Sequence, residues 1–361
     1  MIVAPLAALV LAACGGGGDA KAAGGDGGAA TSRSSSVDLT GAGATFPQPI
    51  YNKWFSDYAA KTGVRINYQS IGSGGGIRQL SEQTVDFGAS DSPMKDDEMA
   101  KARGGPVLHV PTVLGAVAIT YNAPEIQKPL RLTGDVLADV FLGKVTRWND
   151  ARIAALNPGV ALPAKDILVV RRSDGSGTTY IFTDYLAAVS PAWAGGPGKG
   201  KEVQWPVGLG GKGNEGVAGQ VKQTPGTIGY VELAYARQNR LSVAELRNAA
   251  GNFVSPSVET VAAAAAGVAE KLPPESDYRL SIVNAPGPNA YPISSFTWIL
   301  LYRNQADPVK AGKLVDFLRW ALRDGDSTAV ALDYVPLPEA LASRLDQRLA
   351  QLAPASAQGA K

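Results

Sequence analysis

Short segments rich in β-branched and aromatic residues alternate with helical patterns from Val37 onward, and this alternation constrains the fold more than any other feature of the chain. Such alternation is the signature of an α/β fold. The clearest strand spans residues 166–172, whose apolar run at 167–170 is unbroken and typical of a strand buried in a mostly parallel sheet. A globular α/β protein is therefore expected.

The spacing of apolar residues predicts further elements on both sides of this strand. Helices are expected at residues 47–60, 94–102, 179–188, 308–323 and 338–352, and strands at 64–68, 85–89 and 296–302. In the helix over 308–323, we expect the inner face to carry four apolar side chains: Val309, Leu314, Phe317 and Leu318. These patterns alone do not fix domain boundaries.

The charge of the chain is nearly balanced, with 34 basic and 32 acidic residues and a net charge of +2. Such a chain has no electrostatic footprint for nucleic acid or for an anionic membrane surface. Its 361 residues are enough for two domains of ordinary size. An anionic ligand must therefore be captured by local groups, and no nucleic-acid partner is expected.

Residues 2–13 form a short apolar run that ends at Leu11-Ala12-Ala13-Cys14. The run is too short to span a bilayer and has small residues where a signal peptidase needs them. It resembles a bacterial lipoprotein signal, which implies that residues 1–13 are removed and that a lipid is attached to the sulfur of Cys14. No Lys or Arg follows Met1, unlike a typical leader, and a buried N-terminal helix with an incidental cysteine is the alternative.

The residues after this cysteine are mostly Gly, Ala and Ser and lack the large apolar groups that offset the entropy of ordering. We expect residues 14–36 to form a flexible tether that ends where the folded part begins, near Val37. Residues 353–361 are similarly small and polar and are expected to form a flexible tail. The single cysteine of the chain excludes internal disulfides and multi-cysteine metal sites.

Four loops rich in glycine or hydroxyl residues each lie where an extended segment gives way to a helix. In the first, residues 41–47, Pro47 suits the first turn of a helix, and Thr45 can place its hydroxyl and amide beside the unpaired amides there. Such a helix start favours an anion, although an ordinary helix cap without a ligand is the alternative. In the second, residues 71–76, glycines let backbone amides come close to a bound group and Ser73 adds a hydroxyl, with a flexible turn as the alternative.

The third loop, residues 85–93, contains Ser90, Asp91 and Ser92 ahead of the expected helix at 94–102. Any of the three side chains could cap that helix, and capping is the alternative to a ligand contact for Asp91.

The fourth loop, residues 171–178, brings a guanidinium, hydroxyls and free amides to one helix N-terminus. This combination suits a tetrahedral oxyanion. Because neighbouring residues of a strand point to opposite sides, only one of Arg171 and Arg172 should face the ligand.

The four loops read GAGATFP at 41, IGSGGG at 71, VDFGASD at 85 and RRSDGSGT at 171. With GLGGKGNEG at 208 and GTIGYVE at 226, they resemble the phosphate-binding proteins of bacterial high-affinity phosphate ABC transporters, and the resemblance extends from Val37 to about Leu349. It implies a two-lobed periplasmic binding-protein fold with a hinge and a ligand cleft between the lobes. Lobe I would comprise residues 37–112 and 285–352, and lobe II residues 113–284.

The resemblance also implies which residues hold the phosphate. Phe46 would act through its backbone amide. The implied ligand residues are Thr45, Phe46, Ser73, Asp91, Arg172, Ser176, Gly177 and Thr178. Asp174 would hold Arg172 in place, and Gly74 stands where close relatives often have serine. A monomer without cofactor or metal would deliver phosphate to the permease and ATPase subunits of the transporter, outside the cytoplasmic membrane and anchored to it through the lipid on Cys14.

Asp91 would then select the ligand. Near pH 7 inorganic phosphate carries at least one proton and sulfate carries none, so a site with many donors and one carboxylate acceptor accepts phosphate and repels sulfate. A carboxylate that faces a ligand unable to donate costs on the order of a few kcal/mol, which is a preference of about a hundredfold or more. Arsenate has the shape and protonation of phosphate, so the sequence does not separate these two ligands.

Two other functions fit parts of this pattern. A phosphatase or other hydrolase also holds phosphate with Arg, Ser and Asp, but the only histidine, His109, is expected to be a partly buried strand residue, and no H-x-x-x-H or paired-carboxylate spacing suggests a metal. With neither base nor metal, we expect a binding protein and not an enzyme. A surface lipoprotein that binds phosphate for adhesion or sensing is also compatible with the sequence, and neighbouring genes for a permease and an ATPase would distinguish it.

Overall fold

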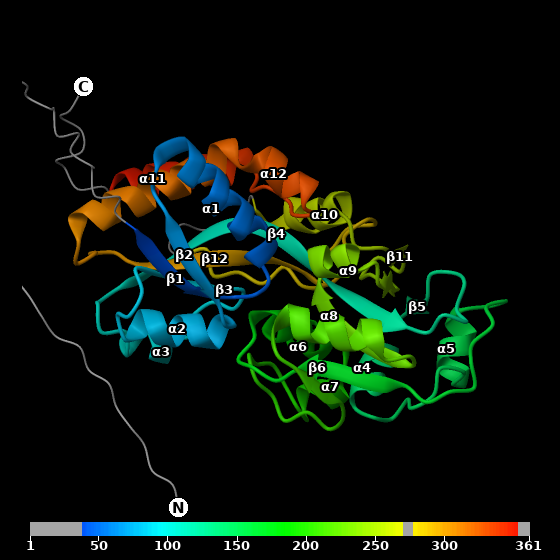
Figure 1. Ribbon diagram of the computed structural model, residues 1–361. Helices are drawn as coiled ribbons and strands as arrows, with labels where there is room; N and C mark the ends of the chain where they lie inside the picture. Colours follow the sequence, from blue (N-terminus) through cyan, green and yellow to red (C-terminus); the bar gives the residue numbers. More distant parts are fainter. Residues whose placement is uncertain (1–37, 270–276, 353–361) are drawn as a thin grey trace, which may run out of the picture. The chain divides into compact units, whose positions relative to one another are not determined.

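The computed structural model describes residues 38–269 and 277–352, which fold into a mixed α/β structure (Figure 1). The predicted signal peptide, Cys14 with its tether, and the tail at 353–361 lie outside the described residues. Among the described residues, no helix is both long enough and apolar enough to cross a membrane.

Each predicted strand and helix is present close to its predicted place, among further strands and helices that were not predicted. The strands are β1 (Leu39–Gly43), β2 (Ile66–Ser70), β3 (Phe87–Ser90), β4 (Val107–Asn122), β5 (Arg131–Leu132), β6 (Leu168–Arg172), β7 (Leu209–Gly211), β8 (Thr227–Glu232), β9 (Ser242–Val243), β10 (Glu245–Arg247), β11 (Phe253–Val254) and β12 (Ser294–Tyr302). The helices are α1 (Gln48–Thr62), α2 (Ser73–Ser81), α3 (Asp96–Ala100), α4 (Gly134–Phe141), α5 (Ala151–Leu156), α6 (Gly177–Val189), α7 (Pro191–Ala194), α8 (Gly213–Gln223), α9 (Leu233–Asn239), α10 (Val258–Ala269), α11 (Pro308–Asp324), α12 (Asp326–Ala331) and α13 (Glu339–Ala350).

Most of the described strands form one large sheet in the order β2-β1-β3-β12-β4-β8-β6-β7, with β9 paired to β4. The two ends of the sheet are parallel, because β1 pairs in parallel with β2 and β3, and β6 with β7 and β8. In the middle, β12 runs antiparallel to both β3 and β4, and β4 runs antiparallel to β8. The loops that follow β1, β3 and β6 thus lie at carboxyl ends of strands, where α/β proteins bind ligands.

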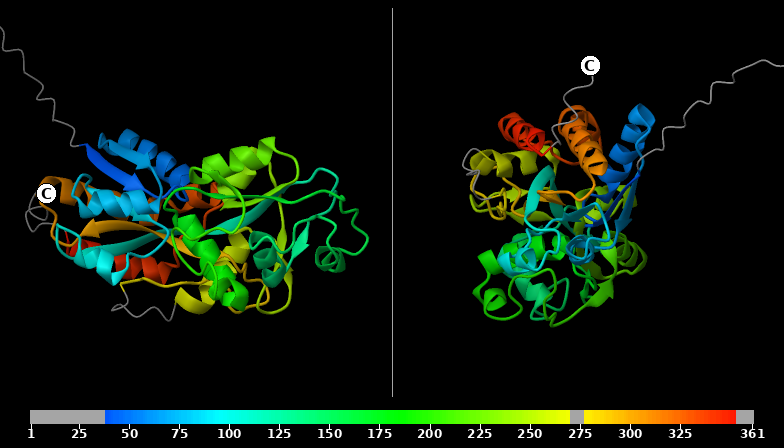
Figure 2. Two further views of the ribbon diagram at one scale, coloured as in Figure 1. Left: turned by 90° about the horizontal axis from the view of Figure 1, so that it is seen from below. Right: turned by 90° about the vertical axis from the view of Figure 1, so that its left-hand side faces the viewer.

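Strand β4 is shared by the two halves of this sheet. Its residues 107–116 pair with β12 and its residues 117–122 pair with β8, so the pairing partner changes between Ala116 and Val117. One half contains β1, β2, β3 and β12 with α1, α2 and α11, and the other contains β6, β7 and β8 with α4, α6 and α8 (Figures 1 and 2). The chain therefore passes from one half to the other along β4.

Helix α1 packs an aromatic face against the first half of the sheet. Tyr51, Trp54, Phe55 and Tyr58 are buried, and the centre of the Phe55 ring lies 5.2 Å from that of Phe317 on α11. Spacings of three and four residues put these side chains on one face of the helix. The expected helix at 47–60 is confirmed, and its packing fixes the loop that precedes it.

The second predicted loop differs from the expectation, because helix α2 already begins at Ser73 and its glycines lie in the first turn. A Cβ on Gly76 would lie 2.5 Å from the carbonyl oxygen of Ala42 and 2.9 Å from that of Ala89. Glycine at this position therefore lets the helix rest directly on strands β1 and β3, and the run of glycines is not a flexible turn.

The prediction for the inner face of α11 is wrong at one position. Leu314, Phe317 and Leu318 are buried, but Val309 is 55% exposed. At 100° per residue, Val309 is rotated by about 140° from Leu314 around the helix, so it lies outside the buried stripe. Leu168, the first residue of β6, is likewise 43% exposed, although it lies within the apolar run at 167–170.

Candidate functional site

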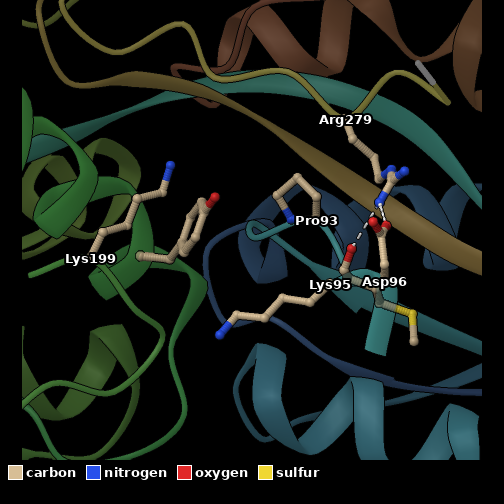
Figure 3. A pocket seen from close by; sticks show the side chains of 7 residues that line it. Pro93, Lys95, Asp96, Lys199 and Arg279 are labelled. Carbon is tan, nitrogen blue, oxygen red and sulfur yellow. Dashed lines mark hydrogen bonds and ion pairs between the residues drawn. The ribbon is translucent and has the colours of Figure 1, made fainter. Parts of the chain in front are cut away.

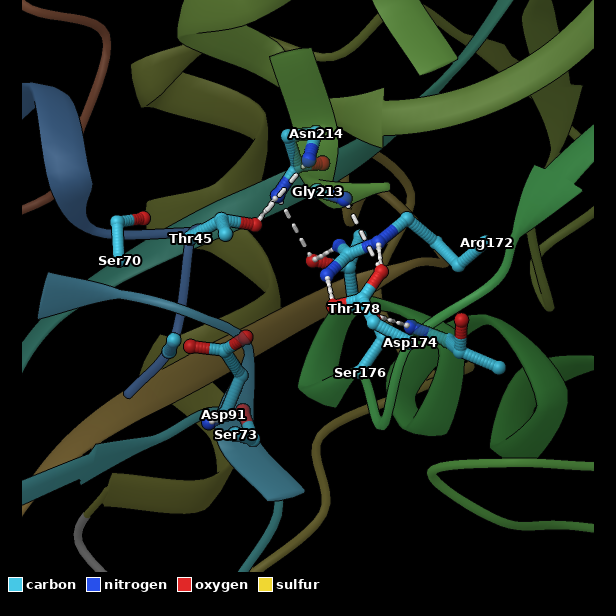
Figure 4. A network of polar contacts seen from close by, with 12 residues as sticks. Thr45, Ser70, Ser73, Asp91, Arg172, Asp174, Ser176, Thr178, Gly213 and Asn214 are labelled. Atoms are coloured by element: carbon cyan, nitrogen blue, oxygen red, sulfur yellow. Dashed lines mark hydrogen bonds and ion pairs between the residues drawn. The ribbon is translucent and has the colours of Figure 1, made fainter. Parts of the chain in front are cut away.

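The first and fourth predicted loops meet through one asparagine (Figure 4). The side-chain amide of Asn214, at the start of α8, donates to Thr45 Oγ1 at 2.7 Å, and its backbone amide donates to the same oxygen at 3.2 Å. The side-chain amide also donates to Thr178 Oγ1 at 3.1 Å. Asn214 therefore connects the loop after β1 with the start of α6.

The second and third loops meet at Ser73 and Asp91, which are both buried. The backbone amide of Asp91 donates to Ser73 Oγ at 3.2 Å, and the hydroxyl of Thr297 on β12 donates to Asp91 Oδ1 at 2.8 Å. Burial raises the pKa of Asp91 to about 7, against the opposing effects of Thr297, Arg172 and Ser73. Helix α3 is preceded by Lys95 at its N-cap, so Asp91 does not cap that helix and the capping alternative is excluded.

Arg172 is the buried member of the two neighbouring arginines at the end of β6. Its Nε donates to Asp174 Oδ1 at 2.8 Å, its Nη2 also bonds Asp174, and its Nη1 lies 3.4 Å from Thr178 Oγ1. Burial acts to raise the pKa of Asp174, but the hydrogen bonds and the charge of Arg172 outweigh it, and the pKa falls below its usual value. Arg171 is half-buried and donates back to the carbonyl of Arg172, so the two side chains lie in different environments as the strand pattern predicts.

Helix α6 begins at this meeting point. Ser176 is its N-cap and accepts a hydrogen bond from the amide of Thr179 at 3.0 Å. The amides of Gly177 and Thr178 lie in the first turn, where a helix offers them no internal acceptor. A Cβ on Gly177 would lie 2.5 Å from Asp91 Oδ2, so the helix start directly faces the third loop.

The neighbours of the Thr45 and Thr178 hydroxyls leave each hydroxyl free to donate a hydrogen bond. A hydroxyl has one proton and two lone pairs. Asn214 occupies both lone pairs of Thr45, and Asn214 with Arg172 occupies those of Thr178. Each hydroxyl proton is therefore available to a third group, and together with the amides of the helix start these protons favour an oxyanion.

Positive charge alone does not make this site. The charge of Arg172 is compensated by Asp174, and Asp91 is a second acid at the same place. An anion would thus be held mainly by oriented hydrogen-bond donors and the helix N-terminus, with one carboxyl as the acceptor.

His109 has a structural role in strand β4. It is fully buried, its Nε2 accepts a hydrogen bond from the amide of Met94 at 3.0 Å, and its Nδ1 lies 2.7 Å from an oxygen of Asp277. Both ring nitrogens are therefore used within the protein, and the ring supports the loop that carries Asp91. The strand position is as predicted, but burial is complete where partial burial was expected.

A separate pocket of 540 Å³ lies beside the site, between the loop after β3 and helix α6 (Figure 3). It is lined in part by Pro93, Asp96, Tyr180, Lys199 and Arg279, and by none of the eight predicted ligand residues. Arg279 is paired with Asp96 at 2.7 Å, and Lys199 lies 4.5 Å from the centre of the Tyr180 ring. The predicted ligand residues therefore form a different site from this pocket.

Comparison with known proteins gives the family. The family model described as the PBP superfamily domain matches residues 27–324. The chain is 47% identical over 315 residues to the phosphate-binding protein PstS of Xylella fastidiosa (strain Temecula1), covering 87% of the chain and 85% of that protein. It is 48% identical over 310 residues to the phosphate-binding protein PstS of Pasteurella multocida, covering 85% and 88%. The chain belongs to the PstS family.

The fold of this PstS family member is also that of a solved periplasmic protein. The high-affinity periplasmic phosphate-binding protein PfluDING, solved with bound phosphate, matches with a TM-score of 0.68 and 22% identity, over 86% of this chain and 93% of that chain. The likeness is one of fold, and the expected two-lobed binding-protein fold is confirmed.

One residue of the site carries a role that the sequence analysis misses. Asn214 lies in the GLGGKGNEG motif, which indicates the family but no role for this residue, yet Asn214 is fully buried and bonds both Thr45 and Thr178. The available signal is an asparagine that directly follows the glycine-rich residues 208–213. Thr297 is missed as well, because its partner Asp91 is 206 residues away in the chain.

Proposed function

We propose that this chain binds inorganic phosphate in the site formed by the four loops and delivers it to the permease and ATPase subunits of an ABC importer outside the cytoplasmic membrane. The relatives at 47% and 48% identity carry the name phosphate-binding protein, and the chain is accordingly a binding protein and not an enzyme. Its place outside the cytoplasmic membrane is consistent with the periplasmic protein of the same fold.

Eight residues hold the ion in this proposal: Thr45, Phe46, Ser73, Asp91, Arg172, Ser176, Gly177 and Thr178. The observation that carries it is that the lone pairs of the Thr45 and Thr178 hydroxyls are occupied by Asn214 and Arg172, so that both hydroxyls present protons beside the free helix amides. Asp91 is then the one acceptor, and it accepts a hydrogen bond from the protonated oxygen that phosphate still carries near pH 7.

Lobe I comprises residues 37–112 and 285–352, and lobe II residues 113–284. The change of pairing partner inside β4, between Ala116 and Val117, supports a boundary within this strand. Two contacts between the lobes support closure around the ion: the amide of Gly74 donates to the carbonyl of Gly175 at 2.8 Å, and Lys201 pairs with Glu98 at 2.6 Å. Relatives often have serine at position 74. Glycine here leaves room for the close backbone contact with Gly175.

The protein acts as a monomer held at a bacterial membrane by a lipid on Cys14, with residues 15–36 as the tether. Metabolic labelling with a fatty acid tests the anchor: the wild-type protein takes up label and Cys14→Ser does not. Label that persists in Cys14→Ser contradicts the anchor and leaves phosphate binding unaffected.

Thermal unfolding with added anions tests the proposed ligand. Phosphate and arsenate should both raise the midpoint of unfolding of phosphate-stripped protein, because a ligand that binds only the folded state stabilises it. Sulfate at the same concentration should raise it far less. Equal shifts with sulfate and phosphate would contradict selection through Asp91.

A further inference from the structure

Glu232 is a buried carboxyl that lies beside the proposed anion site without contributing to it. It is the last residue of β8, pairs with Val117 of β4, and caps α9 by accepting the amide of Ala234 on Oε2 at 2.9 Å. Its side chain is fully buried. The charged groups that act on it, Asp333 and Asp91, are both carboxyls and not cations.

The hydroxyl of Tyr334 indicates where the nearby protons are. It lies 2.7 Å from the carbonyl oxygen of Phe46 and 2.9 Å from Glu232 Oε2. A tyrosine hydroxyl has one proton to donate, and a peptide carbonyl has none. If Tyr334 donates to Phe46, its contact with Glu232 is a hydrogen bond only when the carboxyl of Glu232 carries a proton.

The second oxygen of the carboxyl gives the same answer. Glu232 Oε1 is buried and has no hydrogen-bond partner among residues 38–269 and 277–352. An unpartnered oxygen of a carboxylate is far more costly to bury than the carbonyl oxygen of a neutral acid. Burial accordingly raises the pKa of Glu232 well above its usual value, against the contact with Tyr334 and the hydrogen bond from the amide of Ala234.

We propose that Glu232 is a neutral carboxylic acid that donates its proton to Tyr334, which in turn donates to Phe46 and so positions the first anion loop. Glu232 is a positioning residue, since it acts through Tyr334 and touches no predicted ligand group with its side chain. Its backbone amide donates to Asn214 Oδ1 at 2.9 Å, which fixes the side-chain amide that bonds Thr45 and Thr178. The positioning role rests on the proposed phosphate site, whereas the protonation of Glu232 does not.

The titratable groups around Glu232 are few and can be separated by experiment. Tyr334 and Asp333 lie on the segment after α12, Tyr235 lies on α9, and Asp91 follows β3. Among them only Glu232 and the two aspartates are carboxyls, so a difference between wild type and Glu232→Gln isolates one carboxyl group. The amide of glutamine can donate to Tyr334 as the neutral acid does, but its nitrogen cannot accept from the amide of Ala234 as the acid oxygen does.

Infrared difference spectroscopy at neutral pH tests the protonation directly. The wild-type spectrum minus that of Glu232→Gln should contain the carbonyl band of a protonated carboxylic acid. Tyr334→Phe should shift the frequency of that band, because its hydrogen-bond partner is gone. A difference spectrum with only carboxylate bands would overturn the proposal.

The pH dependence of unfolding gives an independent readout. A neutral Glu232 keeps, in the folded protein, a proton that the unfolded chain releases above the ordinary carboxyl pKa. The unfolding constant of the wild type should therefore rise relative to Glu232→Gln by up to about tenfold for each pH unit as the pH increases toward the raised pKa. Parallel curves for the two proteins would contradict a neutral Glu232.

Phosphate titration of the same variants tests the positioning role. Glu232→Ala should weaken phosphate binding at least tenfold, and Glu232→Gln should restore part of that loss through its hydrogen bond to Tyr334. Equal affinities of wild type and Glu232→Ala would overturn the positioning role while the infrared band still supports the protonation. If the wild type binds no phosphate at all, the proposed function fails and the protonation state is still decided by the spectrum.

Discussion

Gly177 and Asp91 approach each other so closely that a Cβ on Gly177 would lie 2.5 Å from Asp91 Oδ2. Gly177 opens helix α6 in one half of the sheet, and Asp91 follows β3 in the other half. The lack of a side chain at this one position lets the donors of the helix start come within reach of the acceptor. Both can then contact one small anion, and this contact between the halves is the basis of the proposed site.

Gly177→Ala should therefore weaken phosphate binding. Overpacking of a well-packed contact costs about 1–3 kcal/mol, which corresponds to an affinity about 5- to 150-fold lower. Gly219→Ala is the matched control, because Gly219 lies within α8 and a Cβ there would meet nothing within 4 Å. Calorimetry should show a loss of affinity in the first variant alone, and equal affinities in both would show that the close approach is not needed for binding.

Asp91→Asn should reduce the preference for phosphate over sulfate. The side-chain amide no longer repels a ligand that lacks a proton. We therefore expect the dissociation constant for sulfate, divided by that for phosphate, to fall at least tenfold. Competition titration of both anions against each protein measures this ratio. An unchanged ratio would place the recognition of the ligand's proton at another residue.

The unliganded protein should lose stability as the pH rises from about 4 to 7. Burial raises the pKa of Asp91 to about 7 in the folded protein, so the folded state keeps a proton that the unfolded chain releases near pH 4. This difference destabilises the folded state at pH 8 by about 4 kcal/mol relative to a group with no shift. Denaturant unfolding of phosphate-stripped protein measures the free energy of unfolding at each pH. This free energy should fall less steeply with pH in Asp91→Asn than in the wild type. Identical pH dependence of the two proteins would contradict the raised pKa.

Asn214→Ala should weaken phosphate binding about tenfold or more. The variant removes the two hydrogen bonds of the side-chain amide to Thr45 and Thr178, and each is worth about 0.5–1.5 kcal/mol. Asn252→Ala is the control, since Asn252 is an exposed residue whose side-chain amide donates to the carbonyl of Pro288, away from the site. A phosphate affinity for Asn214→Ala equal to that of the control would show that the hydroxyls are oriented without Asn214.

The local part of this fold could be predicted from the sequence. The apolar runs at 167–170 and 296–302 identify β6 and β12, and the aromatic spacing at Trp54 and Tyr58 identifies α1, because each pattern reflects burial of one strand or one helix face. The prediction for Val309 fails because it counts apolar residues without the helix period, which places Val309 about 140° from Leu314.

The contacts of the site depend on pairings that span the chain. The bond between Asp91 and Thr297 joins residues 206 positions apart, and the approach of Gly177 to Asp91 requires the two halves of the sheet to be placed by β4. No local pattern carries that information. The eight proposed ligand residues follow from the family resemblance, whereas the roles of Asn214, Thr297 and Glu232 follow only from the structure.

Isothermal titration calorimetry of phosphate-stripped protein with inorganic phosphate tests the central claim most directly. One tight site per chain is expected, since the hydroxyls, the helix amides and Arg172 converge on one place. Excess sulfate should leave the titration almost unchanged. No heat of binding and no saturable site would contradict the account of the four loops as a phosphate site.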